Sequence, residues 1–225
     1  MIRLPLYTFF LVSTLEILFL TFEWPEAQLI AKPLIVLSLL WYYFINAQSR
    51  SNIFIAALIF CWAGDVFLLF ENRNELFFIF GLVSFLIGHT FFILTYRQQR
   101  FEKATHELLG TQKARLLFPI ILAGTGLVAI LYPALGDLKM PVIVYAAVLT
   151  VMVICALLRY GRTTKASFAF VLSGALLFML SDSLLAINKF LSPLSMAGVS
   201  IILTYILAQY LIVAGVLAHT NIQTK

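Results

Sequence analysis

The amino-acid sequence predicts an all-α membrane protein in which eight helices cross the bilayer. Hydrophobic residues make up 62% of the 225 residues, charged residues only 11%, and the mean hydropathy is +1.01. A chain this apolar must satisfy its backbone polar groups inside lipid, which favours helices. Its apolar stretches are about 18–22 residues long, the length at which a helix crosses a hydrocarbon core of about 30 Å. No polar stretch is long enough for a soluble domain, so residues 1–225 are predicted to form a single transmembrane domain.

The eight apolar stretches lie at about 4–22, 28–46, 52–70, 76–96, 115–132, 140–158, 168–188 and 196–218. The first has one flanking arginine and no small-residue cleavage site, so we expect a retained helix and not a signal peptide. The fifth is the least regular, because it contains Gly124 and Gly126 and ends at Tyr132 and Pro133.

The distribution of Lys and Arg predicts the orientation. Of the 15 such residues, all but Lys32, Arg73, Lys139 and Lys189 would lie on the side of the N-terminus. Because cytoplasmic loops carry the excess of positive charge, both termini are predicted to be cytoplasmic, in the inner membrane if the protein is bacterial. The net charge of +5 then reflects topology and attraction to anionic lipids, and does not indicate a nucleic-acid partner.

Two aspartates interrupt the apolar stretches, Asp65 in CWAGDVFLLF and Asp182 in LLFMLSDSLLAI. An Asp at the centre of a membrane helix costs about 2.5–3.5 kcal/mol on insertion scales. One such residue could merely hold helices together through a Lys or hydroxyl partner, but two in similar contexts favour a functional site. Each lies about five or six residues before the outer end of its stretch, roughly 8 Å below the outer interface. We therefore expect them to face one pocket near the outer face.

Two charged residues of the first stretches lie at a comparable depth. Glu16 is close to the outer end of the first stretch, and Lys32 is close to the outer end of the second. They could neutralise each other as an ion pair. Alternatively, Lys32 could bind an anionic group of a substrate.

Polar side chains of the fourth and eighth stretches extend the predicted pocket. Phe85, His89 and Phe92, followed by Tyr96, recur at helical spacing and place an imidazole on an aromatic face. Tyr205 and Gln209 share a face one turn apart in the eighth stretch. His89 is suited either to packing or to catalysis, and an intramembrane glutamine commonly links helices.

The third and fourth stretches weakly resemble the seventh and eighth. Superimposing Asp65 on Asp182 aligns residues 64–69 with residues 181–186. Four plus four spans would give a parallel repeat, because an even number of spans preserves orientation.

Several chemistries lack the residues they need. Only His89 among the three histidines lies well inside a stretch, so a three-histidine zinc site is not expected, and we predict neither a metal nor a cofactor. The sequence has no Gly-x-Ser-x-Gly nucleophile motif and no phosphate-binding Gly-rich loop. A carboxylate pair remains, which suits acid–base chemistry on a lipid with one carboxyl protonated and the other ionised.

At these residues the chain resembles the YhhN family of bacterial and animal integral membrane proteins. The resemblance extends over nearly the whole chain, and the residues 174–183 together with the Ala-Gln-Tyr ending are its most specific part. Its motifs are Lys32-Pro33, Gly64-Asp65, Gly81-x-x-x-Phe85-x-x-x-His89, Tyr145, the residues 174–183 and Tyr205-x-x-Ala208-Gln209-Tyr210.

The resemblance implies an eight-span fold and hydrolysis of the vinyl ether bond of lysoplasmalogens to a fatty aldehyde and a glycerophospho-head group. Asp65 and Asp182 would then be the catalytic pair, because protonation of the alkene needs an acid and the resulting oxocarbenium ion needs an anion. The partners would be a lysophospholipid substrate and membrane lipids. The remaining site residues would bind phosphate or orient substrate and water: Lys32, Lys189, His89, Tyr145, Tyr205 and Gln209.

Two other functions use the same residues. A proton- or cation-coupled transporter of lipids or small molecules would bind its ions at the intramembrane carboxylates, preferably near the midplane. A lipid-binding scaffold without catalysis would need neither aspartate beyond folding.

Overall fold

The computed structural model describes residues 3–102, 104 and 108–223. Lys103 and Lys225, two of the cations that predict the orientation, and His106 lie outside the described residues. The chain forms two compact units, the first made of Met1–Thr95 with Thr220–Lys225 and the second of Tyr96–His219.

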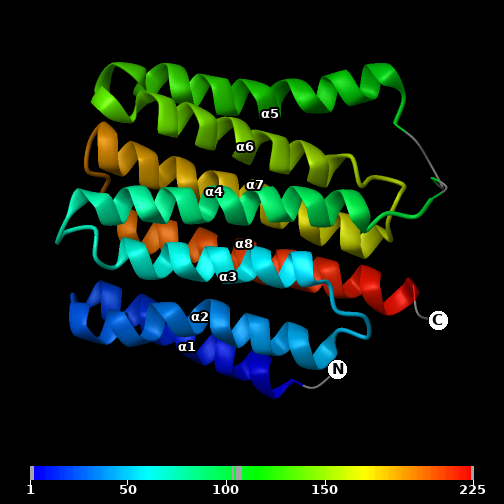
Figure 1. The fold of residues 1–225 in the computed structure, drawn as a ribbon, viewed down its shortest axis with the longest axis horizontal. Helices are drawn as coiled ribbons and strands as arrows, with labels where there is room; N and C mark the ends of the chain where they lie inside the picture. Colours follow the sequence, from blue (N-terminus) through cyan, green and yellow to red (C-terminus); the bar gives the residue numbers. More distant parts are fainter. Residues whose placement is uncertain (1–2, 103, 105–107, 224–225) are drawn as a thin grey trace. The chain divides into compact units, whose positions relative to one another are not determined.

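The described part of the chain consists of helices and their connections, without a strand (Figure 1). Eight α-helices correspond one to one to the eight predicted stretches. Their bounds, with two short 3-10 helices after α5, are α1 Leu4–Thr21, α2 Pro25–Asn46, α3 Asn52–Leu68, α4 Glu75–Gln98, α5 Gly110–Leu131, η1 Tyr132–Ala134, η2 Gly136–Leu138, α6 Lys139–Leu157, α7 Lys165–Phe190 and α8 Ala197–Gln223.

Several helix ends differ from the prediction, among them those of α2, α3 and α5. α2 begins at Pro25, where proline suits the first turn of a helix, so Lys32 lies two turns inside α2 and does not open it. α3 ends at Leu68, and the Ser51 hydroxyl caps its start by accepting from the Phe54 amide at 3.3 Å. α5 begins at Gly110, which shortens the polar connection after α4.

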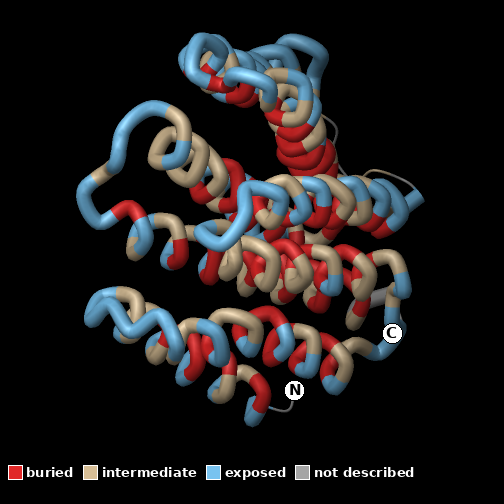
Figure 2. Tube along the Cα trace, turned by 60° about the vertical axis from the view of Figure 1, so that its left-hand side comes forward, coloured by how far each residue is buried: buried red, intermediate tan, exposed pale blue. Residues whose placement is uncertain are grey.

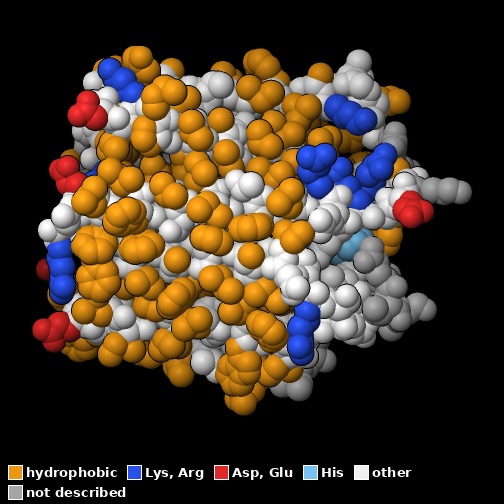
Figure 3. Space-filling view, in the orientation of Figure 1, with side chains coloured by type: hydrophobic (Ala, Val, Ile, Leu, Met, Phe, Trp, Pro, Cys, Tyr) orange, Lys and Arg blue, Asp and Glu red, His pale blue; other side chains and the backbone are white. Residues whose placement is uncertain are grey.

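Length and composition identify a multi-pass membrane protein. Among the described residues, seven helices (α1, α2 and α4 to α8) are long and apolar enough to cross a bilayer, whereas α3 has 17 residues and is shorter. Large apolar side chains also point outward, such as Phe118 at 66% and Leu122 at 56% exposure on α5. Figure 3 shows hydrophobic side chains along the visible helix surfaces and charged ones near helix ends, as a lipid environment requires.

Close helix contacts hold the first unit together. α1 lies beside α2, and α2 packs on α3 (Figure 1). α3 and α4 approach at glycines: a Cβ added at Gly64 would lie 2.6 Å from the Phe85 ring, and one at Gly88 would lie 3.0 Å from the Cys61 sulfur. Small residues at such contacts let helix backbones approach in membranes. Figure 2 shows buried residues on one side of these helices and exposed residues on the other.

The second unit is held in the same way at α7 and α8. The Ser167 hydroxyl on α7 donates to the Gly215 carbonyl on α8 at 2.6 Å. At Gly174 an added Cβ would lie 2.9 Å from the Ala208 carbonyl oxygen and 3.0 Å from the Ile212 amide nitrogen. These neighbours are backbone atoms, which cannot move aside without moving α8.

We expect Gly174→Ala to lower the stability of the fold by about 1–3 kcal/mol, because the methyl group overpacks the α7–α8 contact. Gly126→Ala is the matched control, since nothing lies within 4 Å of a Cβ at that helical position. It should leave stability unchanged or raise it slightly, as alanine favours helix. Thermal unfolding in detergent compares the two variants, and equal midpoints would show that the close approach at Gly174 is not needed.

Candidate functional site

Asp65 is a buried carboxyl of the first unit, on α3 less than one turn before its end at Leu68. Its side chain is only 2% exposed. The preceding residue, Gly64, is covered by the Phe85 ring of α4. The carboxyl is therefore buried, next in sequence to a glycine at which α3 packs closely against α4.

The predicted aromatic face of α4 is confirmed. Phe85, His89, Phe92 and Tyr96 are all buried, and His89 is completely so. The His89 ring stacks near Phe85, with the ring centres 6.4 Å apart. The imidazole thus lies one turn along α4 from the ring that covers Gly64.

A cavity of about 430 Å³ opens in the first unit where α2 begins and α3 ends. Its lining includes Lys32 and Glu26 from α2 and Glu71 and Arg73 from the turn after α3. Leu69, which also lines it, follows Asp65 by one helical turn. The cavity brings two cations and two carboxylates together one turn from the buried Asp65, a combination that suits a zwitterionic ligand.

Glu16 is fully buried on α1. Neither of its carboxyl oxygens has a hydrogen-bond partner among the described residues, although the positive charge of Lys32 acts on the carboxyl. The direct Glu16–Lys32 ion pair that was one of the two expectations is therefore not formed. Lys32 instead lines the cavity, as the other expectation requires.

Asp182 belongs to the second unit and is only half-buried, on α7 two turns before its end at Phe190. The Tyr145 hydroxyl of α6 donates to its Oδ2 at 2.5 Å. This hydrogen bond links α6 to α7 at the level of Asp182. The next residue back, Ser181, donates to the Ile201 carbonyl of α8 at 3.0 Å and fixes α7 against α8 at this level.

Tyr205 and Gln209 confirm their predicted common face on α8. The Gln209 side-chain nitrogen donates to the Tyr205 hydroxyl at 3.0 Å, and the Tyr205 ring meets Phe178, one turn before Asp182, edge-on at 5.4 Å. Gln209 is fully buried, and its side-chain oxygen accepts no hydrogen bond from any described residue. Lys189 lies two turns beyond Asp182 on α7 and is exposed.

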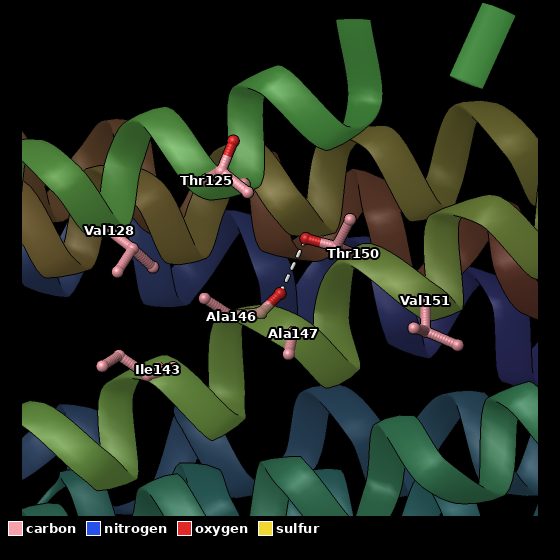
Figure 4. A pocket seen from close by; sticks show the side chains of 8 residues that line it. Thr125, Val128, Ile143, Ala146, Ala147, Thr150 and Val151 are labelled. Carbon is pink, nitrogen blue, oxygen red and sulfur yellow. Dashed lines mark hydrogen bonds between the residues drawn. The ribbon is translucent and has the colours of Figure 1, made fainter. Parts of the chain in front are cut away.

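A groove of about 350 Å³ between α5 and α6 is almost entirely apolar (Figure 4). Its two hydroxyls are turned to their own helices: Thr150 donates to the Ala146 carbonyl at 2.7 Å and Thr125 to the Ile121 carbonyl at 2.8 Å. No titratable side chain lines it. The groove suits a lipid chain and offers no catalytic group.

The helix ends change the estimate that both aspartates lie at the same depth. Asp65 is three residues from the end of α3 and Asp182 eight from the end of α7, which is roughly 5 and 12 Å at 1.5 Å per residue. These distances differ from the expected five or six residues because α3 ends two residues before, and α7 two residues after, the predicted end of its stretch. The two residues belong to different units, so their convergence on one pocket stays a prediction.

Sequence reasoning assigned Glu26, Glu71 and Arg73 no role in the site. The only signal that pointed to Arg73 was its place among the few cations on the predicted outer side. Glu26 and Glu71 carried no signal, because an acidic residue at a helix end is common in any membrane protein.

The comparisons with known proteins agree on one family. The model of the YhhN family matches residues 27–216. The chain is 31% identical over 170 residues to a human protein named Lysoplasmalogenase TMEM86A, covering 73% of this chain and 64% of that protein. It is 31% identical over 140 residues to a Mycobacterium tuberculosis protein named Lysoplasmalogenase, covering 61% of this chain and 50% of that protein. No solved structure is significantly similar to the chain.

The chain thus spans less than two thirds of the length of these two relatives. The comparisons do not support the transporter alternative. The family match extends from α2, through both units and both aspartates, into α8. This chain belongs to the YhhN family.

Proposed function

We propose that this protein hydrolyses the vinyl ether bond of a lysoplasmalogen or a related lysolipid. The proposal rests on the position of Asp65, a carboxyl of a membrane protein that is only 2% exposed. It lies one helical turn from the cavity lined by both cations and carboxylates, which we call the mixed-charge cavity. The names of two similar relatives supply the bond. The site would face the outer leaflet, as the distribution of Lys and Arg predicts.

The reaction needs one proton donor and one anion. Transfer of a proton to the second carbon of the alkenyl chain leaves an oxocarbenium ion at the first carbon and the ether oxygen. Water adds to the first carbon and loses a proton, and the hemiacetal collapses to the aldehyde and the free glycerol hydroxyl. The same division of labour between two carboxyls operates in glycoside hydrolysis.

The surroundings of the two aspartates suit different roles in this reaction, one as the anion and the other as the proton donor. Asp182 accepts a hydrogen bond from Tyr145, so we assign it the role of the anion that stabilises positive charge. Asp65 is the more buried of the two, and we assign it the role of the acid that donates the proton. Their action on the same bond is part of this proposal.

The cavity beside Asp65 would hold the head group. Lys32 and Arg73 would bind the phosphate, and Glu26 and Glu71 would bind the ammonium of an ethanolamine head group. Lys189, which is exposed on α7, remains a second candidate for the phosphate. We keep Tyr205 and Gln209, with His89, as residues that orient water or substrate.

The proposal is tested with the purified protein in detergent and three lysolipids that share the ethanolamine head group. Aldehyde should be released from the vinyl ether lipid and not from the saturated alkyl ether, which cannot be protonated to an oxocarbenium ion. An acyl ester analogue should also remain intact. Failure to release aldehyde from the vinyl ether would contradict the proposal.

We expect Tyr145→Phe to lower the turnover of aldehyde release by about 10- to 100-fold, because a hydrogen bond to a charged group is worth about 1.5–3 kcal/mol. Steady-state kinetics should show the loss in kcat more than in KM. Tyr132→Phe is the control, since Tyr132 is 48% exposed and also lies in the second unit. Equal kcat values for the two variants would remove Tyr145 from the mechanism.

A further inference from the structure

Arginines converge at the end of the second unit where α4 and α6 end and α7 begins. Arg100 bridges the two helix ends: its Nε donates to the Tyr96 carbonyl at 3.0 Å and its Nη2 to the Cys155 carbonyl at 3.3 Å. The Phe101 amide donates to the Arg162 carbonyl at 2.7 Å and ties the two connecting segments together. Figure 3 shows Lys and Arg side chains gathered at this end of the unit.

Arg159 is completely buried at the same end of the unit. Its Nη2 donates to the Ser167 hydroxyl at 2.7 Å, and its guanidinium carbon lies 5.5 Å from the centre of the Tyr96 ring. Nε and Nη1 have no hydrogen-bond acceptor among the described residues. A buried cation with two unused donors is costly unless an anion contributes to its surroundings.

The charges at this end act against one another. Burial lowers the pKa of Arg159 to about 10, and the charge of Arg100 acts in the same direction. Burial likewise lowers the pKa of Arg100; Cys155 acts in the opposite direction, and the charges of Arg162 and Arg97 lower the pKa further. Arg100 is held close to the other cations by its hydrogen bonds to two backbone carbonyls, and positive charges kept together in this way attract an anion.

A cavity of about 350 Å³ opens beside these arginines. Three cations line it, Arg100, Lys113 and Arg162, together with Tyr160 and two leucines, Leu108 and Leu158. No described carboxylate is part of the lining, and the nearby Glu102 is exposed. A polar, cationic wall with a tyrosine and apolar neighbours matches the boundary between lipid head groups and acyl chains.

We propose that this cavity is a binding site for the phosphate group of an anionic phospholipid, held by Arg100, Lys113 and Arg162 at the end of the unit where Arg159 is buried. It is distinct from the candidate catalytic residues of the same unit. Asp182 lies 17 residues from the start of α7, roughly 25 Å along the helix from this end. The distribution of Lys and Arg predicts that this end faces the cytoplasmic leaflet, where anionic head groups attract such basic pockets.

Surface charge that only sets the orientation of the chain would also place cations at this end. The two explanations differ in where the charge must be. To set the orientation of the chain, cations may lie anywhere on this side of the membrane. A binding site requires the particular cations that line the cavity. Arg115 and Lys165 lie at the same end, are exposed and do not line the cavity, so they provide a matched control.

The test is native mass spectrometry of the full chain in a neutral maltoside detergent, titrated with phosphatidylglycerol or phosphatidylcholine. Wild type should bind phosphatidylglycerol at least about 10-fold more tightly than phosphatidylcholine. The double variant Lys113→Gln/Arg162→Gln should lose about 10-fold or more of its phosphatidylglycerol affinity, because each surface cation contributes severalfold. Its thermal unfolding should match that of wild type, since Arg162 keeps its backbone bond to Phe101.

The control variant Arg115→Gln/Lys165→Gln removes the same charge and should change the affinity less than about twofold, as expected for screened surface charges. An equal loss in both variants would overturn the proposal in favour of unspecific attraction. Inorganic phosphate provides the second arm: if it binds as tightly as phosphatidylglycerol and displaces it, the ligand is a soluble anion and the lipid assignment is wrong.

Discussion

Asp65→Asn is expected to reduce the rate of aldehyde release by about 100- to 10,000-fold, the range over which a positioned general acid contributes. The amide has nearly the shape of the carboxyl, so the packing of α3 against α4 is retained. It cannot give up a proton to carbon, however, and the first step of the proposed reaction then depends on water. The measurement is kcat for lysoplasmenylethanolamine, with head-group affinity followed separately.

Asp137→Asn is the control for this variant. Asp137 is exposed in the short helix η2 and lines neither the mixed-charge cavity nor the α5–α6 groove. It should keep wild-type turnover. If folded Asp65→Asn protein also keeps wild-type turnover, Asp65 is a structural residue and the acid must be sought elsewhere.

Asp182→Asn is expected to lower turnover by about 100- to 1,000-fold, as the loss of an electrostatic stabiliser does in other enzymes. The neutral amide still accepts the Tyr145 hydrogen bond, but it no longer balances the charge of an oxocarbenium ion. Asp182 is half-buried and Asp65 almost fully buried. Asp182→Asn therefore removes the proposed anion, whereas Asp65→Asn removes the proposed proton donor.

A double-mutant cycle separates the role of Asp182 from a general loss of structure. If Tyr145 acts through Asp182, Tyr145→Phe should have little further effect once Asp182 has been replaced by Asn. Independent, additive losses would show that the hydrogen bond between the two residues does not belong to the catalytic machinery.

Hydrophobicity alone predicted the helices well, because a membrane helix must be apolar over its whole length. All eight stretches became α-helices, and the helical spacing of Phe85, His89, Phe92 and Tyr96 correctly placed these side chains on a buried face. Helical spacing also predicted that Tyr205 and Gln209 share a face, since residues four apart in a helix are neighbours.

Contacts between helices could not be predicted in the same way. Tyr145 and Asp182 lie on different helices, and nothing in the sequence indicates that α6 and α7 bring them to hydrogen-bonding distance. The equal depth expected for the aspartates depended on helix ends, which hydropathy locates only to within a turn. Arg159 entered the sequence analysis only as one of the cations that predict the orientation, because the sequence gives no sign that it would be buried against Tyr96 and Ser167.

Hydrolysis in deuterated water shows whether the alkene is protonated at carbon, which is the first step of the proposed reaction. Purified protein is given lysoplasmenylethanolamine in deuterated water, and the aldehyde is reduced to the alcohol as it forms, which prevents later exchange. The proposed reaction predicts one deuterium at the second carbon of the released chain and a slower rate of hydrolysis than in ordinary water. An aldehyde that carries only hydrogen at that carbon, or no aldehyde at all, would contradict it.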